Sequence, residues 1–188
     1  MDIIGAINSA AFQAAGSVAS PALTLSMQYL AESFYVVLAA IIIYLYIKKD
    51  KNVFSFAVAI IVLFLATEVI KDIVKEPRPC TTDSFSGIGG ICESGFSFPS
   101  NHAATLTGLL FFLKGYRYLR ILYLVWLALV LFGRIYLGEH YLTDVIAGMV
   151  LSIIIAAIIY KFSGRINMIL GAIAHKLLKP LFGTEWAG

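Results

Sequence analysis

The sequence predicts an all-α integral membrane protein, a polytopic bundle of about five to six spans forming one domain over residues 1–188. Of its residues, 60% are hydrophobic and 13% are charged, about half the charged fraction of a typical soluble domain. The mean hydropathy is +0.89. The apolar residues gather in stretches long enough to cross a bilayer, which takes about 20 residues. No repeat or linker divides the chain.

Four stretches are long and apolar enough to span a membrane, and they cover roughly residues 30–47, 53–74, 121–137 and 145–161. A fifth, Ala103–Leu113, is shorter but can extend back to the polar residues at 100–102. No cationic segment with a small-residue cleavage site precedes the first span. We therefore expect no cleaved signal peptide.

Both ends of the chain are predicted to form amphipathic helices on the membrane surface. Residues 3–19 are only moderately apolar and contain several polar residues, which favours a surface helix over the alternative of a short extra span. Near the C-terminus, apolar residues recur at helical spacing, with His175, Lys176 and Lys179 off the stripe. The stripe consists of Ile166, Ile169, Leu170, Ile173, Ala174, Leu177, Leu178 and Leu181.

The basic residues predict the orientation of the bundle. Of the 14 lysines and arginines, four lie at one end of the spans and the other ten at the opposite end. The four are Lys71, Lys75, Arg78 and Arg134. The positive-inside rule places the ten in the cytoplasm, so the four should face the periplasm or exterior of a plasma (inner) membrane. This topology accounts for most of the net charge of +3, and no nucleic-acid partner is expected.

Cys80 and Cys92 are the only cysteines, and both fall in the predicted outer loop. An even number of cysteines in an oxidising compartment favours a disulfide, and the alternative is two free thiols. A metal site is not expected, because two cysteines alone do not complete a tetrahedral set of ligands.

Three polar clusters interrupt the apolar sequence, and the predicted topology brings all three to the same end of the spans. They read Lys71-x6-Arg78-Pro79, Pro99-Ser100-Asn101-His102 and Arg134-x5-His140-x3-Asp144. Taken singly, each has an ordinary explanation: a lysine reaching for the interface, a helix cap, or an acidic residue at a helix start. Ionisable residues beside membrane spans are costly, so together they predict a functional site.

The residue types in these clusters suit phosphoryl transfer. Lysine and arginine bind phosphate oxygens, and the free N–H groups of a helix that begins at Ser100 or Asn101 bind anions. If His140 and Asp144 share the first helical turn of the last span, their spacing places them side by side. The carboxylate would then orient the imidazole for attack on phosphorus. A second imidazole, His102, would protonate the leaving oxygen.

The order of the three motifs resembles the type 2 phosphatidic acid phosphatase (PAP2) family of integral-membrane lipid phosphatases. Two positions depart from that family: Asn101 stands where it usually has glycine, and Gly133 stands where a serine commonly precedes the arginine. Asparagine tolerates glycine-like backbone angles better than most residues. The missing serine removes one hydrogen bond to phosphate. Neither departure removes a residue with an essential chemical role.

The resemblance implies a role for each motif residue. His140 would be the nucleophile that forms a phosphohistidine, and Asp144 would orient it. His102 would be the general acid and then the base for the hydrolytic water. The implied phosphate-binding residues are Lys71, Arg78, Ser100, Arg134 and, through nearby backbone N–H groups, Asn101. The resemblance also implies turnover without a metal or cofactor, and the sequence shows no carboxylate cluster suited to Mg²⁺.

The position of the clusters at one end of the spans predicts a phosphate carried by a membrane lipid. Little of the chain lies outside the membrane to recognise a large headgroup, which favours a polyprenyl diphosphate such as undecaprenyl diphosphate. Phosphatidic acid, phosphatidylglycerol phosphate and a lipid A phosphate are the other candidates.

Three alternative functions remain. A lipid phosphotransferase would use the same residues. An anion transporter is less favoured, because its charges usually lie near the bilayer midplane within repeated halves. The same motif occurs in soluble vanadate-dependent haloperoxidases, which the predicted spans disfavour. The sequence leaves the oligomeric state open.

Overall fold

The structure is a computed structural model that describes residues 3–82 and 92–182, with side chains placed up to residue 176. Within these residues every regular element is a helix. The helices are α1 (Ile3–Gly16), α2 (Pro21–Ile47), α3 (Val53–Val74), η1 (Pro79–Thr81, a short 3-10 helix), α4 (Asn101–Leu109), α5 (Arg117–Tyr136), α6 (Leu142–Lys161) and α7 (Ser163–Phe182).

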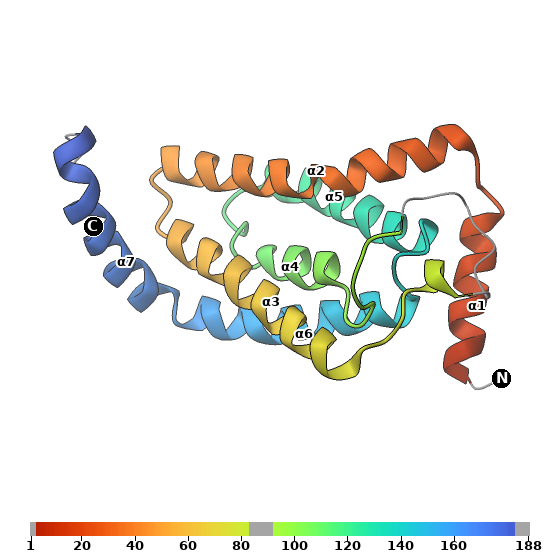
Figure 1. Cartoon of the computed structure of the whole chain (residues 1–188). Helices are drawn as coiled ribbons and strands as arrows, with labels where there is room; N and C mark the ends of the chain where they lie inside the picture. The colour runs from red at the N-terminus through yellow and green to blue at the C-terminus, as the bar shows by residue number, and fades with distance from the viewer. Residues whose placement is uncertain (1–2, 83–91, 183–188) are drawn as a thin grey trace.

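Four helices, α2, α3, α5 and α6, are long and apolar enough to cross a membrane. They run along the length of the bundle (Figure 1) and match the four long stretches predicted from sequence. α2 begins well before residue 30 because the Ser20 side chain accepts a hydrogen bond from the N–H of Leu23, and Pro21 occupies the first turn. The predicted all-α membrane bundle is confirmed.

The fifth predicted span is too short to cross a membrane by itself. α4 has nine residues, roughly 14 Å of helix against a hydrocarbon core of about 30 Å. Ala103–Leu109 is buried throughout, because α4 packs inside the bundle against α3, α5 and α6. Turns then lead to Tyr116, whose hydroxyl donates to Asp50 at the far end of the bundle (2.7 Å). The described chain thus has four helices long enough to be spans, and the segment from α4 to Tyr116 makes a further passage along the bundle between them.

α4 and α6 lie so close together that two glycines are required between them. A Cβ atom at Gly148 of α6 would lie 2.6 Å from the carbonyl oxygen of Ser100, and one at Gly108 of α4 would lie 2.6 Å from the Cβ of Ala156. Ser152 joins the helices by accepting a hydrogen bond from the N–H of Gly108 (2.6 Å). Larger residues would force the helices apart. This packing fixes the start of α4 against the first turns of α6.

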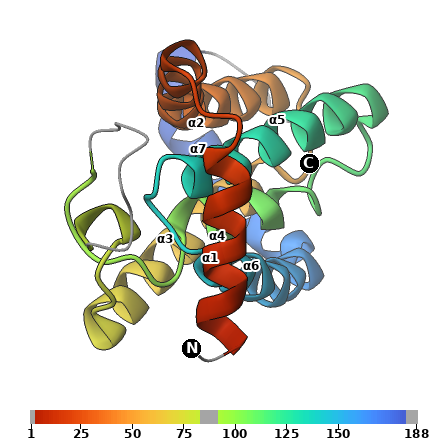
Figure 2. The ribbon, with the colours of Figure 1, turned by 90° about the vertical axis from the view of Figure 1, so that its right-hand side faces the viewer.

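The two ends of the bundle can be told apart by what lies there. At the end called here the site end, α3 and α5 finish and α4 and α6 begin. Figures 1 and 2 show α1 lying across this end, transverse to the long helices. The Asn8 side chain anchors it by donating to the hydroxyl of Thr143 at the start of α6 (3.2 Å). This orientation favours a surface helix over an additional span.

α7 follows α6 at the opposite end and contains the predicted amphipathic stripe. The Asn167 side chain ties it to α3 by accepting from the N–H of Ser55 (3.0 Å) and donating to the Ser55 hydroxyl (2.7 Å). Met168, Ile169 and Ile173 remain exposed, as expected for a helix whose apolar face meets lipid. The last members of the stripe lie beyond the residues with placed side chains.

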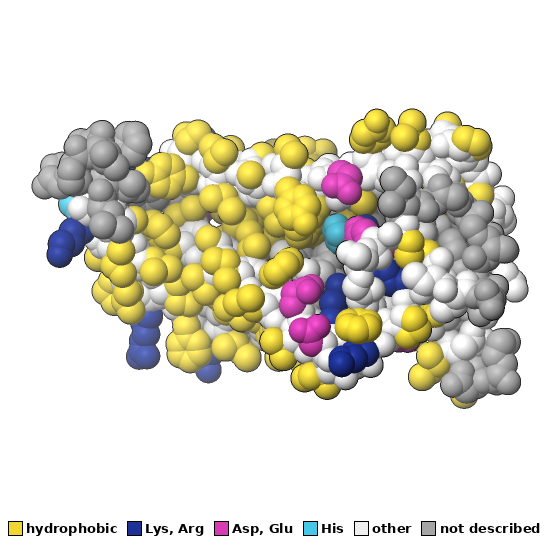
Figure 3. Space-filling view, in the orientation of Figure 1, with side chains coloured by type: hydrophobic (Ala, Val, Ile, Leu, Met, Phe, Trp, Pro, Cys, Tyr) yellow, Lys and Arg dark blue, Asp and Glu magenta, His cyan; other side chains and the backbone are white. Residues whose placement is uncertain are grey.

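The surface separates charge from hydrocarbon. Figure 3 shows a broad hydrophobic face over the long helices. On the same face the acidic side chains gather towards the site end, between α2 and α3, together with a histidine and several basic side chains, and other basic side chains lie at the opposite end. The polar groups are therefore accessible at the margin of the hydrophobic surface.

Candidate active site

The first polar cluster lies where α3 ends. Lys71 is buried in the last turn, and its Nζ is 3.7 Å from Oε1 of Glu68. The helix stops at Lys75, which adopts the left-handed conformation (φ +55°) and donates its N–H to the carbonyl of Lys71. Two prolines then flank Arg78 and restrict its backbone. The turn places the buried Arg78 near enough to Lys71 for the two positive charges to repel each other.

The second cluster forms the start of α4. Ser100 is the N-cap, as predicted, and its side chain accepts a hydrogen bond from the N–H of Ala103 (3.4 Å). Asn101 donates from Nδ2 to Oε1 of Glu68 (3.2 Å), the carboxylate that also pairs with Lys71. The asparagine that departs from the family's glycine thus supports the carboxylate beside the lysine.

His102 lies in the first turn of α4. Its ring packs against Phe34 of α2 with the centroids 4.7 Å apart, and it is partly buried. It is close enough to Arg134, His140 and Lys71 to be electrostatically coupled to all three. Both motif histidines therefore belong to one electrostatic environment, with His102 packed against α2.

The third cluster joins the end of α5 to the start of α6. Arg134, His140 and Asp144 are all buried. The expected shared helical turn is wrong, because α6 begins at Leu142 and His140 precedes it. Tyr141 is instead the N-cap, and its N–H donates to Oδ2 of Asp144 (2.8 Å). This capping box still brings Nδ1 of His140 to 3.6 Å from the same oxygen.

Ser97 lies between His140 and Asp144. Its hydroxyl donates to Oδ2 of Asp144, and its oxygen is 3.4 Å from Nδ1 of His140. Because the single hydroxyl proton goes to the carboxylate, the serine oxygen accepts from an N–H at Nδ1. That tautomer leaves the lone pair on Nε2 of His140.

The surroundings of His140 keep its imidazole uncharged. Burial lowers the pKa of His140 well below its ordinary value, and the positive charges of Arg134, Arg78 and Lys71 lower it further. At neutral pH the ring is therefore in the form that carries a free lone pair. This is the form in which a histidine acts as a nucleophile.

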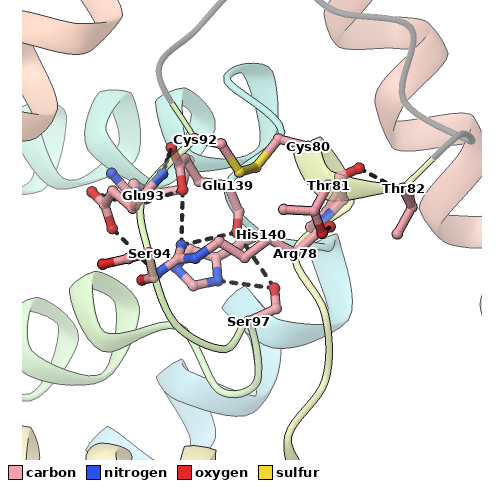
Figure 4. Close-up of a disulfide and its surroundings, with 12 residues drawn as sticks. Arg78, Cys80, Thr81, Thr82, Cys92, Glu93, Ser94, Ser97, Glu139 and His140 are labelled. Carbon is pink, nitrogen blue, oxygen red and sulfur yellow. Dashed lines mark hydrogen bonds and ion pairs between the residues drawn. A yellow bond between two sulfur atoms is a disulfide. The ribbon is translucent and has the colours of Figure 1, made fainter.

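A buried carboxylate, Glu139, contacts both arginines, and Figure 4 shows it beside Arg78. Nη1 of Arg78 lies 2.8 Å from Oε2 of Glu139 and donates also to its backbone carbonyl (3.1 Å). Nη2 of Arg134 is 3.7 Å from the same Oε2. These contacts fix the two guanidinium groups side by side, beside His140.

A second carboxylate, Glu93, bridges the same arginines from the loop before α4. Its Oε1 lies 2.9 Å from Nη2 of Arg134 and its Oε2 lies 3.3 Å from Nη2 of Arg78. Within the described residues, the Nε atoms of both arginines are buried without a hydrogen-bond partner. The pair therefore retains donors for the oxygens of a bound anion.

The Cys80–Cys92 disulfide closes the loop beside this site (Figure 4). The N–H of Cys80 donates to the carbonyl of Gly138 (2.9 Å), which ties the disulfide to the α5–α6 loop. Among the described residues, one group has the spacing of metal ligands, namely Cys80, Cys92 and Glu139. Its two sulfur atoms are bonded to each other, so neither is a thiolate ligand.

Three residues of the site, Ser97, Glu93 and Glu139, were not predicted from sequence. Ser97 precedes a motif by a few positions, and serine is too common in loops to attract notice. Glu139 carried a usable signal: the chain has only 11 acidic residues, and this one directly precedes the motif histidine. Glu93 lies in the Gly-rich loop, where an acidic residue is ordinarily solvated.

A comparison with protein families locates the same region of the chain. The family model described as the PAP2 superfamily matches residues 52–168, a range that contains all three polar clusters. The chain belongs to the PAP2 superfamily.

Two curated relatives that are phosphatases are similar to this chain over different lengths. Lipid A 4'-phosphatase of Bacteroides thetaiotaomicron is 31% identical over 162 residues, which are 78% of this chain and 67% of that protein. Sphingosine-1-phosphate phosphatase 1 of Mus musculus is 34% identical over 117 residues, 57% of this chain. The chain spans only 27% of the length of the mouse relative.

A solved PAP2 structure shares the fold. The crystal structure of the transmembrane PAP2 type phosphatidylglycerolphosphate phosphatase from Bacillus subtilis superposes with a TM-score of 0.69 at 25% identity, covering 88% of each chain. With the apolar helices described above, this likeness makes the chain a multi-pass integral membrane protein.

The packing explains why this PAP2 chain has glycine before its α5 arginine. Gly133 is buried, and a Cβ atom added there would lie 3.3 Å from the sulfur of Met27 on α2. A serine there would require the Met27 side chain to shift by a few tenths of an ångström. The close contact with Met27 therefore favours glycine at this position.

Proposed function

We propose that the chain is a lipid phosphatase that hydrolyses a phosphate or diphosphate on a membrane lipid through a phosphohistidine intermediate. The observation that carries the proposal is the position of His140. It is buried and linked through Ser97 to Asp144, and it lies beside two arginines with unpartnered Nε atoms. An oriented, uncharged imidazole next to an anion-binding pair has the parts that covalent phosphoryl transfer needs.

In the proposed mechanism, Arg78, Arg134 and Lys71 bind the phosphate oxygens and stabilise the charge that develops on them. Nε2 of His140 attacks phosphorus, and the bond from phosphorus to the lipid oxygen breaks. His102, which is protonated when the negatively charged substrate is bound, gives that proton to the lipid oxygen, and the lipid leaves. His102 then takes a proton from water, which attacks the phosphohistidine and releases inorganic phosphate.

Ser100 and Asn101 have a supporting part in this mechanism. Ser100 caps α4 by binding the N–H of Ala103, and the other N–H groups of the first helical turn would assist anion binding. Asp144 holds the proton at Nδ1 of His140 through Ser97 and stabilises the positive charge that the ring acquires on phosphorylation.

The substrate class is supported by the site's position and by the relatives. The polar cluster opens at the margin of the hydrophobic surface (Figure 3), where a lipid headgroup lies. Lipid A, sphingosine-1-phosphate and phosphatidylglycerolphosphate phosphatases are among the similar proteins. We keep polyprenyl diphosphate as a candidate beside phosphatidic acid, phosphatidylglycerol phosphate and lipid A phosphate, because both phosphate and diphosphate offer the same terminal oxygens.

Phosphate release by the purified protein from a panel of these lipids tests the function. We expect turnover in EDTA and inhibition by vanadate, because three cationic side chains supply the charge stabilisation and vanadate adopts the geometry of the phosphoryl transition state. Adding a lipid with a free hydroxyl group as acceptor distinguishes hydrolysis, which releases inorganic phosphate, from phosphotransfer, which yields a phosphorylated acceptor. Loss of all activity in EDTA that Mg²⁺ restores would refute the metal-free mechanism, and no release from any lipid would refute the function.

We further propose that the site end faces the periplasm or cell exterior, because the basic residues of the other end favour the cytoplasm. In a background with Cys80 and Cys92 replaced by serine, a cysteine at the exposed position Thr81 should react with a membrane-impermeant maleimide on intact spheroplasts. One at the exposed position Lys51 should react only after permeabilisation. The reverse pattern of labelling would invert the topology.

A further inference from the structure

Glu93 lies where the proposed mechanism needs a phosphate. Its two carboxylate oxygens contact Arg134 and Arg78 at 2.9 Å and 3.3 Å, and these are the guanidinium groups expected to bind the substrate. The carboxylate is 42% exposed, unlike the buried Glu139 that holds the same arginines from the other side. Glu93 can therefore move into solvent, whereas Glu139 is fixed.

The charges of this cluster are balanced before any substrate binds. Two arginines are matched by two carboxylates, Glu93 and Glu139, so the cluster has no net charge. A phosphate can bind the Nη2 atoms of both guanidinium groups only by displacing Glu93, which now contacts them. Replacing a singly charged carboxylate with a dianion gains one negative charge beside the arginines, and replacing it with a monoanion gains none.

The backbone around Glu93 keeps its carboxylate near the arginines. Cys92 is bonded to Cys80, which lies two residues after Arg78. The N–H of Glu93 also donates to Oε1 of Glu139 (3.0 Å). A group tethered this closely competes at an effective concentration that free anions must exceed, on the order of millimolar for short flexible tethers.

We propose that Glu93 occupies the phosphate subsite in the substrate-free protein as an intramolecular competitor, so that only anions that bind the arginines strongly enough to displace it enter the subsite. The proposal rests on the proposed phosphatase function. A terminal phosphate carries close to two charges at neutral pH and displaces the carboxylate. A phosphodiester headgroup carries one charge and does not.

This competition matters because phosphodiester lipids surround a membrane enzyme at very high local concentration. Glu93 weakens the binding of every anion by the same factor. Phosphodiester headgroups, which bind weakly, then no longer fill the site, whereas a phosphate monoester or diphosphate that binds more tightly still does.

The test compares the purified wild-type protein with E93Q in nonionic detergent. We expect E93Q to bind inorganic phosphate about tenfold more tightly by calorimetry, because a charged competitor is removed. Its KM for a lipid phosphate should fall with little change in kcat. Added phosphatidylglycerol should inhibit E93Q competitively at mole fractions that leave the wild type unaffected.

D72N is the matched control. Asp72 is an exposed carboxylate near the end of α3, so this change removes the same charge from the same end of the protein. The arginine ion pairs of the described residues involve only Glu93 and Glu139. We expect D72N to leave phosphate affinity and phosphatidylglycerol inhibition unchanged. An equal effect in both variants would assign the result to net charge and overturn the proposal.

Other outcomes also decide the matter. If E93Q raises KM or lowers kcat, Glu93 supports the arginines and does not compete with phosphate. If wild type releases phosphate from lipids but E93Q binds phosphate no more tightly, the inference fails and the phosphatase function stands. Tighter phosphate binding by E93Q in a protein that hydrolyses no lipid phosphate would leave the subsite assignment standing and remove the function.

Discussion

Replacing His140 with alanine is expected to abolish phosphate release. The imidazole is buried, uncharged and linked through Ser97 to Asp144, and no water can replace a nucleophile that must become covalently bonded to phosphorus. Removing the nucleophile of a covalent mechanism costs on the order of 10⁵–10⁶ in kcat. Initial rates with the best lipid of the panel measure the loss. Retained binding of vanadate by H140A would show that the arginine subsite is intact.

His102→Ala provides the matched comparison. This variant keeps the nucleophile and loses the acid, so we expect it to be phosphorylated by a substrate with a good leaving group and to turn over slowly. With a lipid substrate labelled in its phosphate, an alkaline quench, in which phosphohistidine survives, should leave labelled phosphate bound to H102A and none bound to H140A. Near-normal turnover by H140A, or label trapped on H140A, would show that the nucleophile is another residue.

Asp144→Asn should lower kcat by about 10³–10⁴, the loss expected when the orienting carboxylate of a catalytic triad becomes an amide. Asparagine keeps an oxygen for the N–H of Tyr141, which Asp144 now accepts at 2.8 Å, so the helix start should survive. It loses the charge that stabilises the imidazolium and can present an N–H to Ser97. Circular dichroism and thermal unfolding check the fold, and kcat measures the effect.

Ser97→Ala separates the effect of the Asp144 charge from that of the hydrogen bonds made by the Ser97 hydroxyl. It removes the hydroxyl between His140 and Asp144 but leaves the carboxylate in place, so we expect a smaller loss, about tenfold to a hundredfold. If S97A were as damaging as D144N, the hydroxyl itself would carry the essential role. If D144N retained wild-type kcat, the proposed orientation of His140 would be wrong.

The long helices could be predicted from the sequence, because bilayer thickness requires a minimum length of apolar residues and such stretches are visible in the sequence. The cap at Ser100 could also be predicted, because its signal is local. The length of α4 could not be predicted in this way. α4 is buried by the surrounding helices and not by lipid. Its residues are therefore as apolar as those of a span, but bilayer thickness does not set its length.

The residues of the site also fall into those with a sequence signal and those that only packing brings together. The motif residues could be identified because their order is specific, although their roles remain proposals. Glu139 and Glu93 could not be assigned, because their importance comes from Arg78 and Arg134, which are distant in sequence and adjacent only after packing. The expectation that His140 and Asp144 share a helical turn failed at Tyr141, where a capping box starts α6 two residues later than the spacing suggested.

The alternating direction of the helices has an electrostatic consequence for the site. An α-helix carries a macrodipole, with partial positive charge at its start and partial negative charge at its end. α3 and α5 end at the site and bear Lys71 and Arg134 in their last turns, whereas α6 begins there and bears Asp144 in its first turn. Each charge thus lies at the helix pole that favours it, by about 0.3–1 kcal/mol. Chain direction therefore favours the cations at the ends of α3 and α5 and the carboxylate at the start of α6.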